Sequence, residues 1–229
     1  MKILYLIPAR EGSKGLSKKN ILTLDGKPMI NYTLDAVIPL KKDNDEICVS
    51  TDSEEIKNIV EKKGIKVPFK RPKHLASDTA SSRDVINHAI KWYSLSNKFF
   101  DLVVLLQPTS PLRTLNHIKE CISLWEQNID MVVSVKETDA NPYYVLFEEN
   151  KDLFLKKSKK GNFTRRQDCP KVYEFNGAIY VIRVKSILHA DFNDFNKIKK
   201  YLMNKESSID VDDIIDFHLA EIMIKKLGS

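Results

Sequence analysis

Residues 3–20 of the 229-residue chain read ILYLIPAREGSKGLSKKN. The apolar run from Ile3 to Ile7 is typical of a short strand buried inside a sheet. It leads directly into a loop with two glycines, which let the backbone approach a ligand and turn its N–H groups toward it. Three cations of this loop, Arg10, Lys14 and Lys19, form a combination that suits a polyphosphate. The stretch therefore predicts an anion-binding loop at the carboxyl end of a buried strand.

The spacing within this loop excludes three familiar sites. The loop lacks the four residues that separate Gly from Gly-Lys in a Walker sequence, and it is not G-x-G-x-x-G. Nor does Gly12-Ser13-Lys14-Gly15 match the G-x-S-x-G of a nucleophile elbow. On composition alone, a solvated turn rich in Gly and Lys explains the loop equally well.

Short apolar runs alternate with segments of helical spacing along the first part of the chain. The runs that predict buried strands are Ile3–Ile7, Glu46–Ser50, Leu102–Leu106 and Met131–Val135. The segments that predict helices are Met29–Val37, Ser53–Lys63, Ser81–Lys91 and Leu115–Gln127. This alternation is typical of an α/β fold with a mostly parallel, doubly wound (Rossmann-like) sheet. Such sheets bind ligands beyond the carboxyl ends of their strands, so residues that directly follow strands become the candidates.

The pattern changes after Pro142. Short aromatic pieces from Tyr143 to Phe147 and from Val172 to Ile182 predict strands, and a basic, turn-rich stretch lies between them. Residues 142–171 therefore predict a small antiparallel flap or dimerisation arm. A final helical pattern covers Asp213–Lys226.

Composition bounds the class of protein. With 42% hydrophobic residues, and with no internal repeat or low-complexity linker, residues 1–229 are expected to form a single domain. No apolar run approaches the roughly 18 residues needed to cross a bilayer, and the first residues are too few for a secretory signal. We therefore expect a cytoplasmic protein without a membrane segment. Cys48, Cys121 and Cys169 are odd in number and widely spaced, which indicates reduced thiols.

The net charge of +6 raises the question of nucleic acid binding. Basic residues gather in short loops, while Lys and Glu elsewhere interleave as on ordinary solvated helices. A nucleic-acid surface requires a continuous basic stripe with aromatic or helix-turn-helix support, and the sequence shows none. An anionic small molecule is the better inference. The five histidines have no ligand spacing, and none is assigned a role.

The loop sequence I-P-A-R-x-G-S-K-G-L-x-x-K-N resembles the nucleotide-binding signature of the acylneuraminate cytidylyltransferases, also called CMP-sialic acid synthetases. Five further motifs follow in the family's order: STD at 50–52, RPKHLASDTASS at 71–82, LQPTSPLRT at 106–114, NGAIY at 176–180 and SIDVD at 208–212. The resemblance runs from residue 3 to about residue 221. Ser17 departs from it, because the family often has proline there, and Glu11 adds a carboxylate to the loop.

The resemblance implies that the loop holds CTP. Arg10 and Lys19 are carried over as phosphate ligands, and Ser13 and Asn20 as polar contacts.

A second set of residues is implied to lie beside the cytosine and ribose. It consists of Arg71, Ser77 and Ser82, in the segment that follows a strand-like piece. Without the family, Ser81 or Ser82 is simply the N-cap of the helix that begins there.

The acceptor is implied to be an acidic nine-carbon sugar. Gln107 follows the buried strand at 102–106 and offers an amide that both donates and accepts, and the resemblance places it beside the sugar. The alternative for this segment is a proline-bounded turn. Arg165, Arg166 and Gln167 match an Arg-Gln pair of the family, and guanidinium groups bind carboxylates bidentately. A solvated basic loop remains the alternative for these three.

Asp210 and Asp212 are one residue apart on a strand-like segment, so both side chains are expected on the same face. Paired carboxylates repel each other unless a cation is present, and Mg²⁺ takes one or two carboxylates together with phosphate oxygens and waters. The resemblance carries both over as metal ligands. The alternative is an acidic cap on the last helix, a task that Asp213 can also perform.

The function implied by the resemblance is transfer of CMP from CTP to the anomeric hydroxyl of a sialic-type acid, with release of pyrophosphate. The implied cofactor is Mg²⁺ or another divalent cation, and the implied assembly is a homodimer joined through the flap. Arg10, Lys19, Asp210 and Asp212 are the implied catalytic residues. Legionaminic, pseudaminic and deaminated neuraminic acids remain alternative acceptors. A non-catalytic nucleotide-sugar binder is the alternative from a different class.

Overall fold

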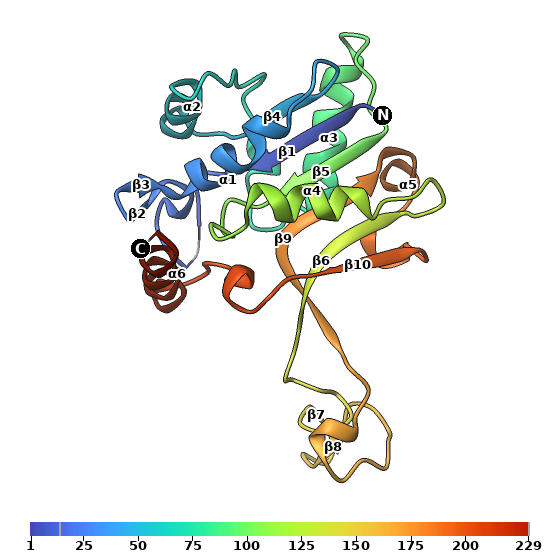
Figure 1. The fold of residues 1–229 in the computed structure, drawn as a ribbon. Helices are drawn as coiled ribbons and strands as arrows, with labels where there is room; N and C mark the ends of the chain where they lie inside the picture. Colours follow the sequence, from blue (N-terminus) through green and yellow to red (C-terminus); the bar gives the residue numbers. More distant parts are fainter. Residues whose placement is uncertain (14, 229) are drawn as a thin grey trace.

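The computed structural model describes residues 1–13 and 15–228, and Lys14, one of the three loop cations, lies outside them. A six-stranded sheet in the order β10-β6-β9-β5-β1-β4 forms the centre (Figure 1). Its strands are β1 (Ile3–Pro8), β4 (Glu46–Ser50), β5 (Leu102–Leu106), β6 (Met131–Glu137), β9 (Tyr173–Arg183) and β10 (Ile198–Leu202). β1 pairs in parallel with β4 and β5, and β10 with β6, whereas β9 runs antiparallel between β5 and β6. The predicted α/β class and mostly parallel sheet are confirmed.

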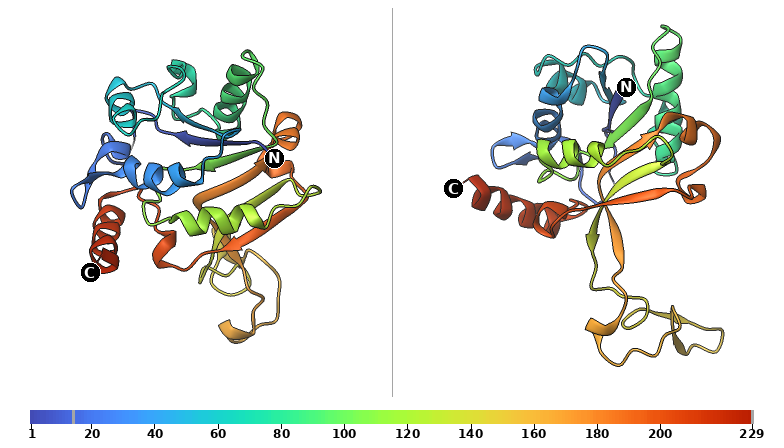
Figure 2. Two further views of the ribbon diagram at one scale, coloured as in Figure 1. Left: turned by 45° about the horizontal axis from the view of Figure 1, so that its top comes forward. Right: turned by 45° about the vertical axis from the view of Figure 1, so that its right-hand side comes forward.

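Helices cover both faces of the sheet, as Figure 2 shows. α1 (Met29–Val37), α2 (Glu54–Glu61) and α4 (Leu115–Ser123) pack on one face, and α3 (Ser82–Ser94) and α5 (Val184–His189) on the other. Successive residues of β1 point to opposite faces, so that Tyr5 and Ile7 join the first core and Leu4 and Leu6 the second. A strand buried on both sides must be apolar throughout, which is why β1 shows no alternation.

Most predicted elements appear within a few residues of their expected bounds. The predicted helix at 115–127 is shorter than expected and ends at Ser123, whereas that at 81–91 continues to Ser94. α5 and β10 were not predicted from the sequence. The strand predicted at 172–182 is confirmed as β9, but the sequence did not predict that its residues 179–183 form the antiparallel strand between β5 and β6 at the centre of the sheet.

The flap itself hangs from the sheet on a two-stranded ribbon. β6 and β9 continue past a bulge between Val133 and Val135 and stay paired as far as Glu137 and Tyr173. Beyond them lies a small hairpin of β7 (Phe147–Glu149) and β8 (Leu155–Lys157), which Figure 1 shows well below the body. Most of the predicted strand at 143–147 is turn, and the strand starts only at Phe147.

Two smaller features complete the fold. The hairpin of β2 (Thr23–Leu24) and β3 (Lys27–Pro28) packs with α6 (Ile214–Gly228) through a separate apolar cluster that includes Leu24, Met29, Val211 and Ala220. Short 3₁₀ turns occur at Lys19–Ile21, Ile38–Leu40, Lys73–Leu75, Arg166–Asp168, Phe192–Asp194 and Glu206–Ser208. Within the described part of the chain, no helix combines the length and apolarity needed to cross a membrane.

Candidate functional site

A cavity of about 430 Å³ lies at the carboxyl ends of β1 and β5. It brings together nine of the residues that the sequence singled out: Arg10, Ser13, Lys19, Asn20, Arg71, Ser77, Ser82, Gln107 and Asp212. Asp210 lines an adjoining cavity of about 600 Å³, and Asp212 borders both. This is the edge at which an α/β sheet is expected to bind its ligand.

The loop after β1 is held close to the carboxylate segment. The Ala9 N–H donates to the Ser50 carbonyl at 2.9 Å, and the Asn20 side-chain amide donates to the Arg10 carbonyl at 2.9 Å. A Cβ atom on Gly15 would lie 2.2 Å from the Asp212 carbonyl oxygen, a separation that only glycine allows. Asn20 therefore braces the loop as well as lining the cavity.

Both loop cations of the cavity are paired with carboxylates. An Arg10 terminal nitrogen lies 2.5 Å from Asp78 Oδ1. Lys19 Nζ lies 2.8 Å from Asp212 Oδ1, and its side chain is only 14% exposed. Each of these two cations therefore faces the cavity with a carboxylate beside it.

Arg71 braces the wall below the segment that leads to α3. It is buried, and it donates from Nε to the Ser50 hydroxyl at 2.9 Å and from Nη2 to the Ser50 carbonyl at 2.5 Å. Burial lowers its pKa to about 10, although the Asp52 carboxylate opposes that shift. The guanidinium remains charged at neutral pH and ties the end of β4 to the cavity wall.

The start of α3 shows which of Ser81 and Ser82 caps the helix, a question that the sequence left open. Ser81 is the N-cap, because its hydroxyl accepts from the Asp84 N–H at 3.1 Å. Ser82, the first helical residue, lines the cavity without being the cap. Ser77 donates to the His74 carbonyl at 3.0 Å and shapes the turn before the helix.

Arg113 is a site residue that the sequence analysis missed. It is 2% exposed, and its Nη1 donates to the carbonyls of Gln107 and Ala178, both at 2.9 Å. Burial lowers its pKa to about 9, and the Asp210 carboxylate opposes that shift. The signal was available in the motif LQPTSPLRT, which contains this arginine, but only the fold shows that it holds the turn carrying Gln107.

The carboxylates Asp210 and Asp212 lie on an extended segment that is not a sheet strand, which corrects the strand-like assignment. The Val211 N–H donates to the Thr109 carbonyl at 2.8 Å and fastens the segment to the end of β5. Asp212 is exposed, whereas Asp210 Oδ1 is buried and has no hydrogen-bond partner among the described residues. Burial raises the pKa of Asp210, the Thr109 hydroxyl opposes this, and the nearby Asp212 carboxylate raises it further.

Asp213, and not Asp210 or Asp212, is the residue that caps the last helix. Asp213 Oδ1 accepts from the N–H groups of Ile215 at 2.8 Å and Asp216 at 3.0 Å, so Asp213 caps α6. This leaves Asp210 and Asp212 without a capping task.

The pair fits a hard divalent cation. A buried carboxylate oxygen without a hydrogen bond is costly, and a cation would satisfy it. No group of three or more His, Cys, Asp or Glu that could hold a metal occurs in the described residues, so the remaining ligands would be phosphate oxygens and water. Mg²⁺ is commonly bound in this way, by one or two carboxylates together with substrate phosphates.

Gln107 and Asp210 approach each other across Gly177. A Cβ atom on Gly177 would lie 2.9 Å from Asp210 Oδ2 and 4.0 Å from Gln107 Nε2, and its φ of +75° also favours glycine. The amide assigned to the acceptor sugar is therefore close to the buried carboxylate.

None of the three flap residues lines either cavity of its own chain, although Arg166 pairs with Asp139, which lines the second one. Arg165 donates to both oxygens of Asp168 at 2.8 and 2.9 Å.

Comparison with known proteins agrees with this geometry. The cytidylyltransferase family profile matches residues 4–225. An N-acylneuraminate cytidylyltransferase of Streptococcus agalactiae serotype V is 39% identical over 95% of the chain, and the chain spans about half (52%) of that relative. A CMP-N,N'-diacetyllegionaminic acid synthase of Legionella pneumophila is 33% identical over 98% of this chain and 97% of its own.

Among solved structures, a CMP:2-keto-3-deoxy-manno-octonic acid synthetase complexed with CTP superposes with a TM-score of 0.73. The match covers 99% of this chain and 100% of the other at 18% identity, so it shows a shared fold. Since the family profile covers nearly the whole chain, the protein belongs to the cytidylyltransferase family.

Proposed function

We propose that the chain transfers CMP from CTP to the anomeric hydroxyl of a nonulosonic (sialic-type) acid and releases pyrophosphate. One observation carries the proposal: a single cavity at the carboxyl end of β1 gathers Arg10 and Lys19 beside Asp212 and next to the buried Asp210. The names of the relatives support this reaction class.

The residues act by positioning and by charge neutralisation, on which phosphoryl-type transfer chiefly depends. Arg10 and Lys19 bind the phosphates that become pyrophosphate and offset the charge that develops on them. Ser13 and the backbone at Gly15 hold the loop against the triphosphate. Asp210 and Asp212 would hold Mg²⁺, which when bound polarises the α-phosphate and acidifies the attacking hydroxyl.

The wall formed by Arg71, Ser77 and Ser82 is the proposed contact for cytosine and ribose. Of the three, Arg71 is buried, and a buried polar group that pairs with one base and is left unpaired by another discriminates between the two. We therefore expect a marked preference for CTP over UTP, ATP and GTP.

The acceptor is proposed to lie beside Gln107, close to Asp210. Two relatives of similar identity carry names with different acceptors, sialic acid for one and N,N'-diacetyllegionaminic acid for the other. Legionaminic, pseudaminic and deaminated neuraminic acids therefore stand beside sialic acid as candidates.

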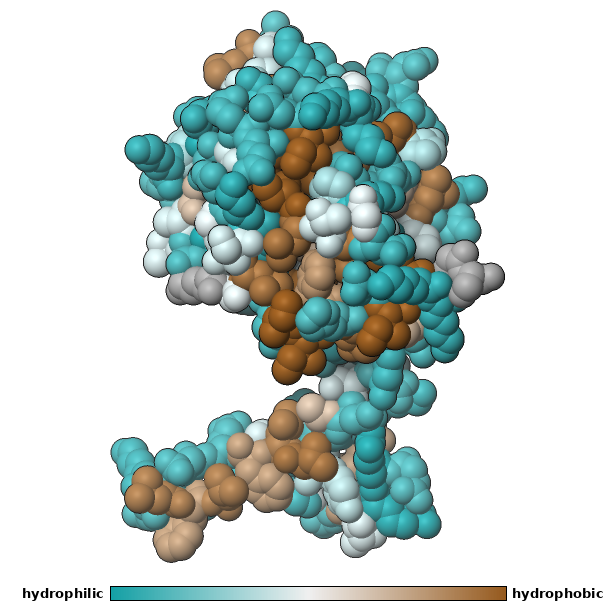
Figure 3. Space-filling model, turned by 90° about the vertical axis from the view of Figure 1, so that its left-hand side faces the viewer, coloured by the Kyte–Doolittle hydropathy of each residue, from teal (hydrophilic) through white to brown (hydrophobic). Residues whose placement is uncertain are grey.

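A homodimer is proposed as the working unit, with the flap of one chain reaching the site of the other. Six large apolar side chains of the flap are 41–75% exposed: Val145, Leu146, Phe147, Leu153, Phe154 and Leu155. Figure 3 shows apolar side chains along the flap and on the lower end of the body above it. Contiguous apolar surface of this kind marks an interface. Arg165, Arg166 and Gln167, which line neither cavity of their own chain, are proposed to bind a sugar carboxylate in the site of the partner.

The reaction is placed in the cytoplasm, a setting that agrees with the three cysteines Cys48, Cys121 and Cys169 being unpaired in the structure.

The test is a pyrophosphate-release assay with each nucleoside triphosphate and a panel of nonulosonic acids. We expect turnover with CTP and at least one of these acids. Binding of CTP without turnover of any member would favour the non-catalytic binder, and equal turnover with UTP would contradict the base-reading wall.

A further inference from the structure

Both terminal nitrogens of Arg10 face a single segment of the cavity wall. Nη2 lies 2.5 Å from Asp78 Oδ1, and Nη1 donates to the Ala76 carbonyl at 3.4 Å. Arg10 and Asp78 both line the cavity, with side chains 29% and 39% exposed. A phosphate oxygen that takes the N–H group now facing Asp78 must therefore displace that carboxylate.

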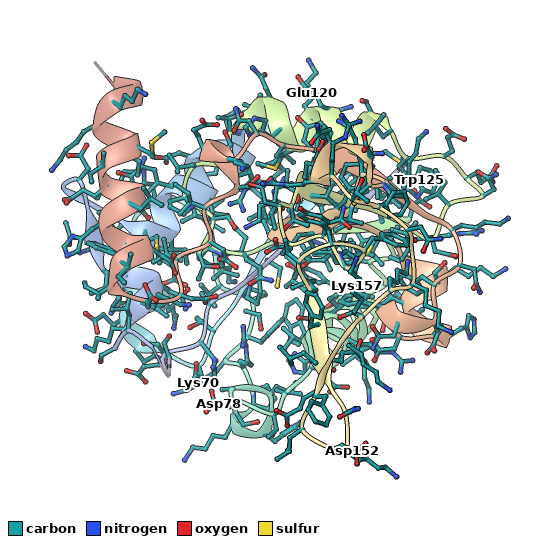
Figure 4. All side chains as sticks on the ribbon, turned by 90° about the horizontal axis from the view of Figure 1, so that it is seen from below. Lys70, Asp78, Glu120, Trp125, Asp152 and Lys157 are labelled. Carbon is teal, nitrogen blue, oxygen red and sulfur yellow. The ribbon has the colours of Figure 1, made fainter. Side chains whose placement is uncertain are left out.

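Asp78 is presented by a turn that the chain itself holds. The Ser77 hydroxyl donates to the His74 carbonyl at 3.0 Å, and the Ala80 N–H donates to the Ser77 carbonyl at 3.3 Å. Figure 4 shows Asp78 at the edge of the molecule, on the segment that precedes α3. Because the turn is anchored at both ends, the carboxylate stays within reach of Arg10 when the guanidinium has another partner.

Asp212 is the second carboxylate that pairs with a cation proposed to bind phosphate, and its surroundings differ from those of Asp78. Asp212 contacts Lys19, but it belongs to the carboxylate pair assigned to the divalent cation. Asp78 stands on residues 72–81, a segment with no other acidic residue. A negative charge that faces the phosphate-binding arginine and is not one of the carboxylate pair opposes binding of a polyanion.

We propose that Asp78 competes with the phosphates for Arg10 and so promotes release of pyrophosphate. The proposal rests on the proposed function, in which Arg10 binds the leaving pyrophosphate. After the bond between the α-phosphorus and its leaving oxygen breaks, Asp78 retakes the guanidinium as pyrophosphate departs. Asp78 is a positioning residue, because it acts through Arg10 and breaks no bond itself.

The affinity of the full chain for sodium pyrophosphate, measured by titration calorimetry with Mg²⁺ present, tests the role of Asp78 directly. In Asp78→Asn, pyrophosphate should bind about fivefold more tightly, the effect of one unit charge a few ångströms away in largely solvated surroundings. Asp78→Glu, which keeps the carboxylate, should stay within about twofold of wild type. Glu11→Gln is the matched control, since it removes one charge next to Arg10 in the chain but from an exposed residue that does not line the cavity.

Kinetics give an independent readout. Asp78→Asn should show a lower KM for CTP. Its rate should also decline earlier in the progress curves, because accumulating pyrophosphate inhibits it more strongly. Inorganic pyrophosphatase should straighten those curves.

Unchanged or weaker pyrophosphate binding by Asp78→Asn, with a wild-type thermal melt, would overturn the proposal and make Asp78 a structural tether. A wild-type chain that binds no pyrophosphate would instead contradict the phosphate role of Arg10 and Lys19 in the proposed function.

Discussion

Gly15 is the residue at which the loop after β1 meets the carboxylate segment. Its lack of a side chain lets the loop lie against the Asp212 carbonyl. The same loop contains Gly12, where an added Cβ would meet nothing within 4 Å. The two glycines look alike in the sequence, and only the fold distinguishes the one that sets the distance between loop and carboxylates.

Gly15→Ala should therefore push the loop away from Asp212. A displacement of about 1 Å at a transfer site costs roughly a hundredfold in kcat/KM. Gly12→Ala should cost much less. Steady-state rates with CTP for both variants check this, and equal losses in the two would show that the loop needs glycine for backbone freedom alone.

The candidate side chains Arg10, Lys19 and Asp212 could be named from the sequence chiefly because they fall in motifs that resemble those of the family. Arg113 and Asp78 also lie in such motifs, but no role could be assigned to them from the sequence. From the sequence alone, an arginine is expected at the surface, because the carbonyl groups that allow Arg113 to be buried are not apparent. Asp78 and Arg10 are 68 residues apart in the chain, so their contact is not apparent either. Contacts of this kind are set by tertiary packing and leave no local pattern.

Elements with strong apolar runs were predicted well, but their neighbours in the sheet were not. β9 is apolar on both faces near residues 178–182, as a central strand must be. The aromatic residues at the start of β9, where it forms the ribbon to the flap, made the central position of this strand hard to predict. The order of strands in a sheet also depends on partners that are far away in the sequence. β10 has exposed and intermediate residues throughout, as suits an edge strand, and it gave no apolar signal.

At the element scale, Asp35 joins α1 to two neighbouring pieces. Lys27 Nζ of β3 lies 2.5 Å from Oδ2, and Lys63 Nζ, just after α2, lies 2.7 Å from Oδ1. Burial alone would raise the pKa of Asp35, but the hydrogen bonds from the two lysines outweigh it and hold the pKa below its ordinary value of 3.8.

A carboxylate whose pKa is lower in the folded than in the unfolded state stabilises the protein at any pH above its unfolded-state pKa. That stability is lost as the pH falls through the folded-state pKa. Asp35→Asn should lower the free energy of unfolding at pH 7 by about 0.5–1 kcal/mol, a figure discounted for solvent exposure of the ion pairs. The difference from wild type should shrink as the pH drops below about 4. Urea unfolding of both proteins between pH 7 and pH 3 checks this, and a difference that stays constant over that range would rule out the ion pairs as its cause.

At the scale of the whole molecule, the flap carries a group of six exposed large apolar side chains. Phe154 and Leu153 at the hairpin are 70% and 75% exposed. Changing both to Ser should convert a dimer to a monomer at micromolar concentration and lower turnover, because the flap would no longer reach the second site.

Leu95→Ser is the control for that experiment. Leu95 is 78% exposed at the end of α3, on the body, so it matches the flap residues in exposure. Light scattering of both proteins should show a dimer for Leu95→Ser alone. A flap variant that remains dimeric and fully active would place the interface elsewhere.

The central claim is that the carboxylate pair at 210 and 212 serves transfer of the cytidylyl group. Its most direct test is the initial rate of CMP-sugar formation against Mg²⁺ concentration for wild type and Asp212→Asn, with Asp213→Asn as control. Asp213 caps α6, and Asn caps about as well as Asp, so the control should stay close to wild type. Asp212→Asn should lose roughly two to four powers of ten in rate with an unchanged thermal melt, since it loses charge stabilisation realised in the transition state. A rate and magnesium dependence equal to those of wild type in Asp212→Asn would contradict the account.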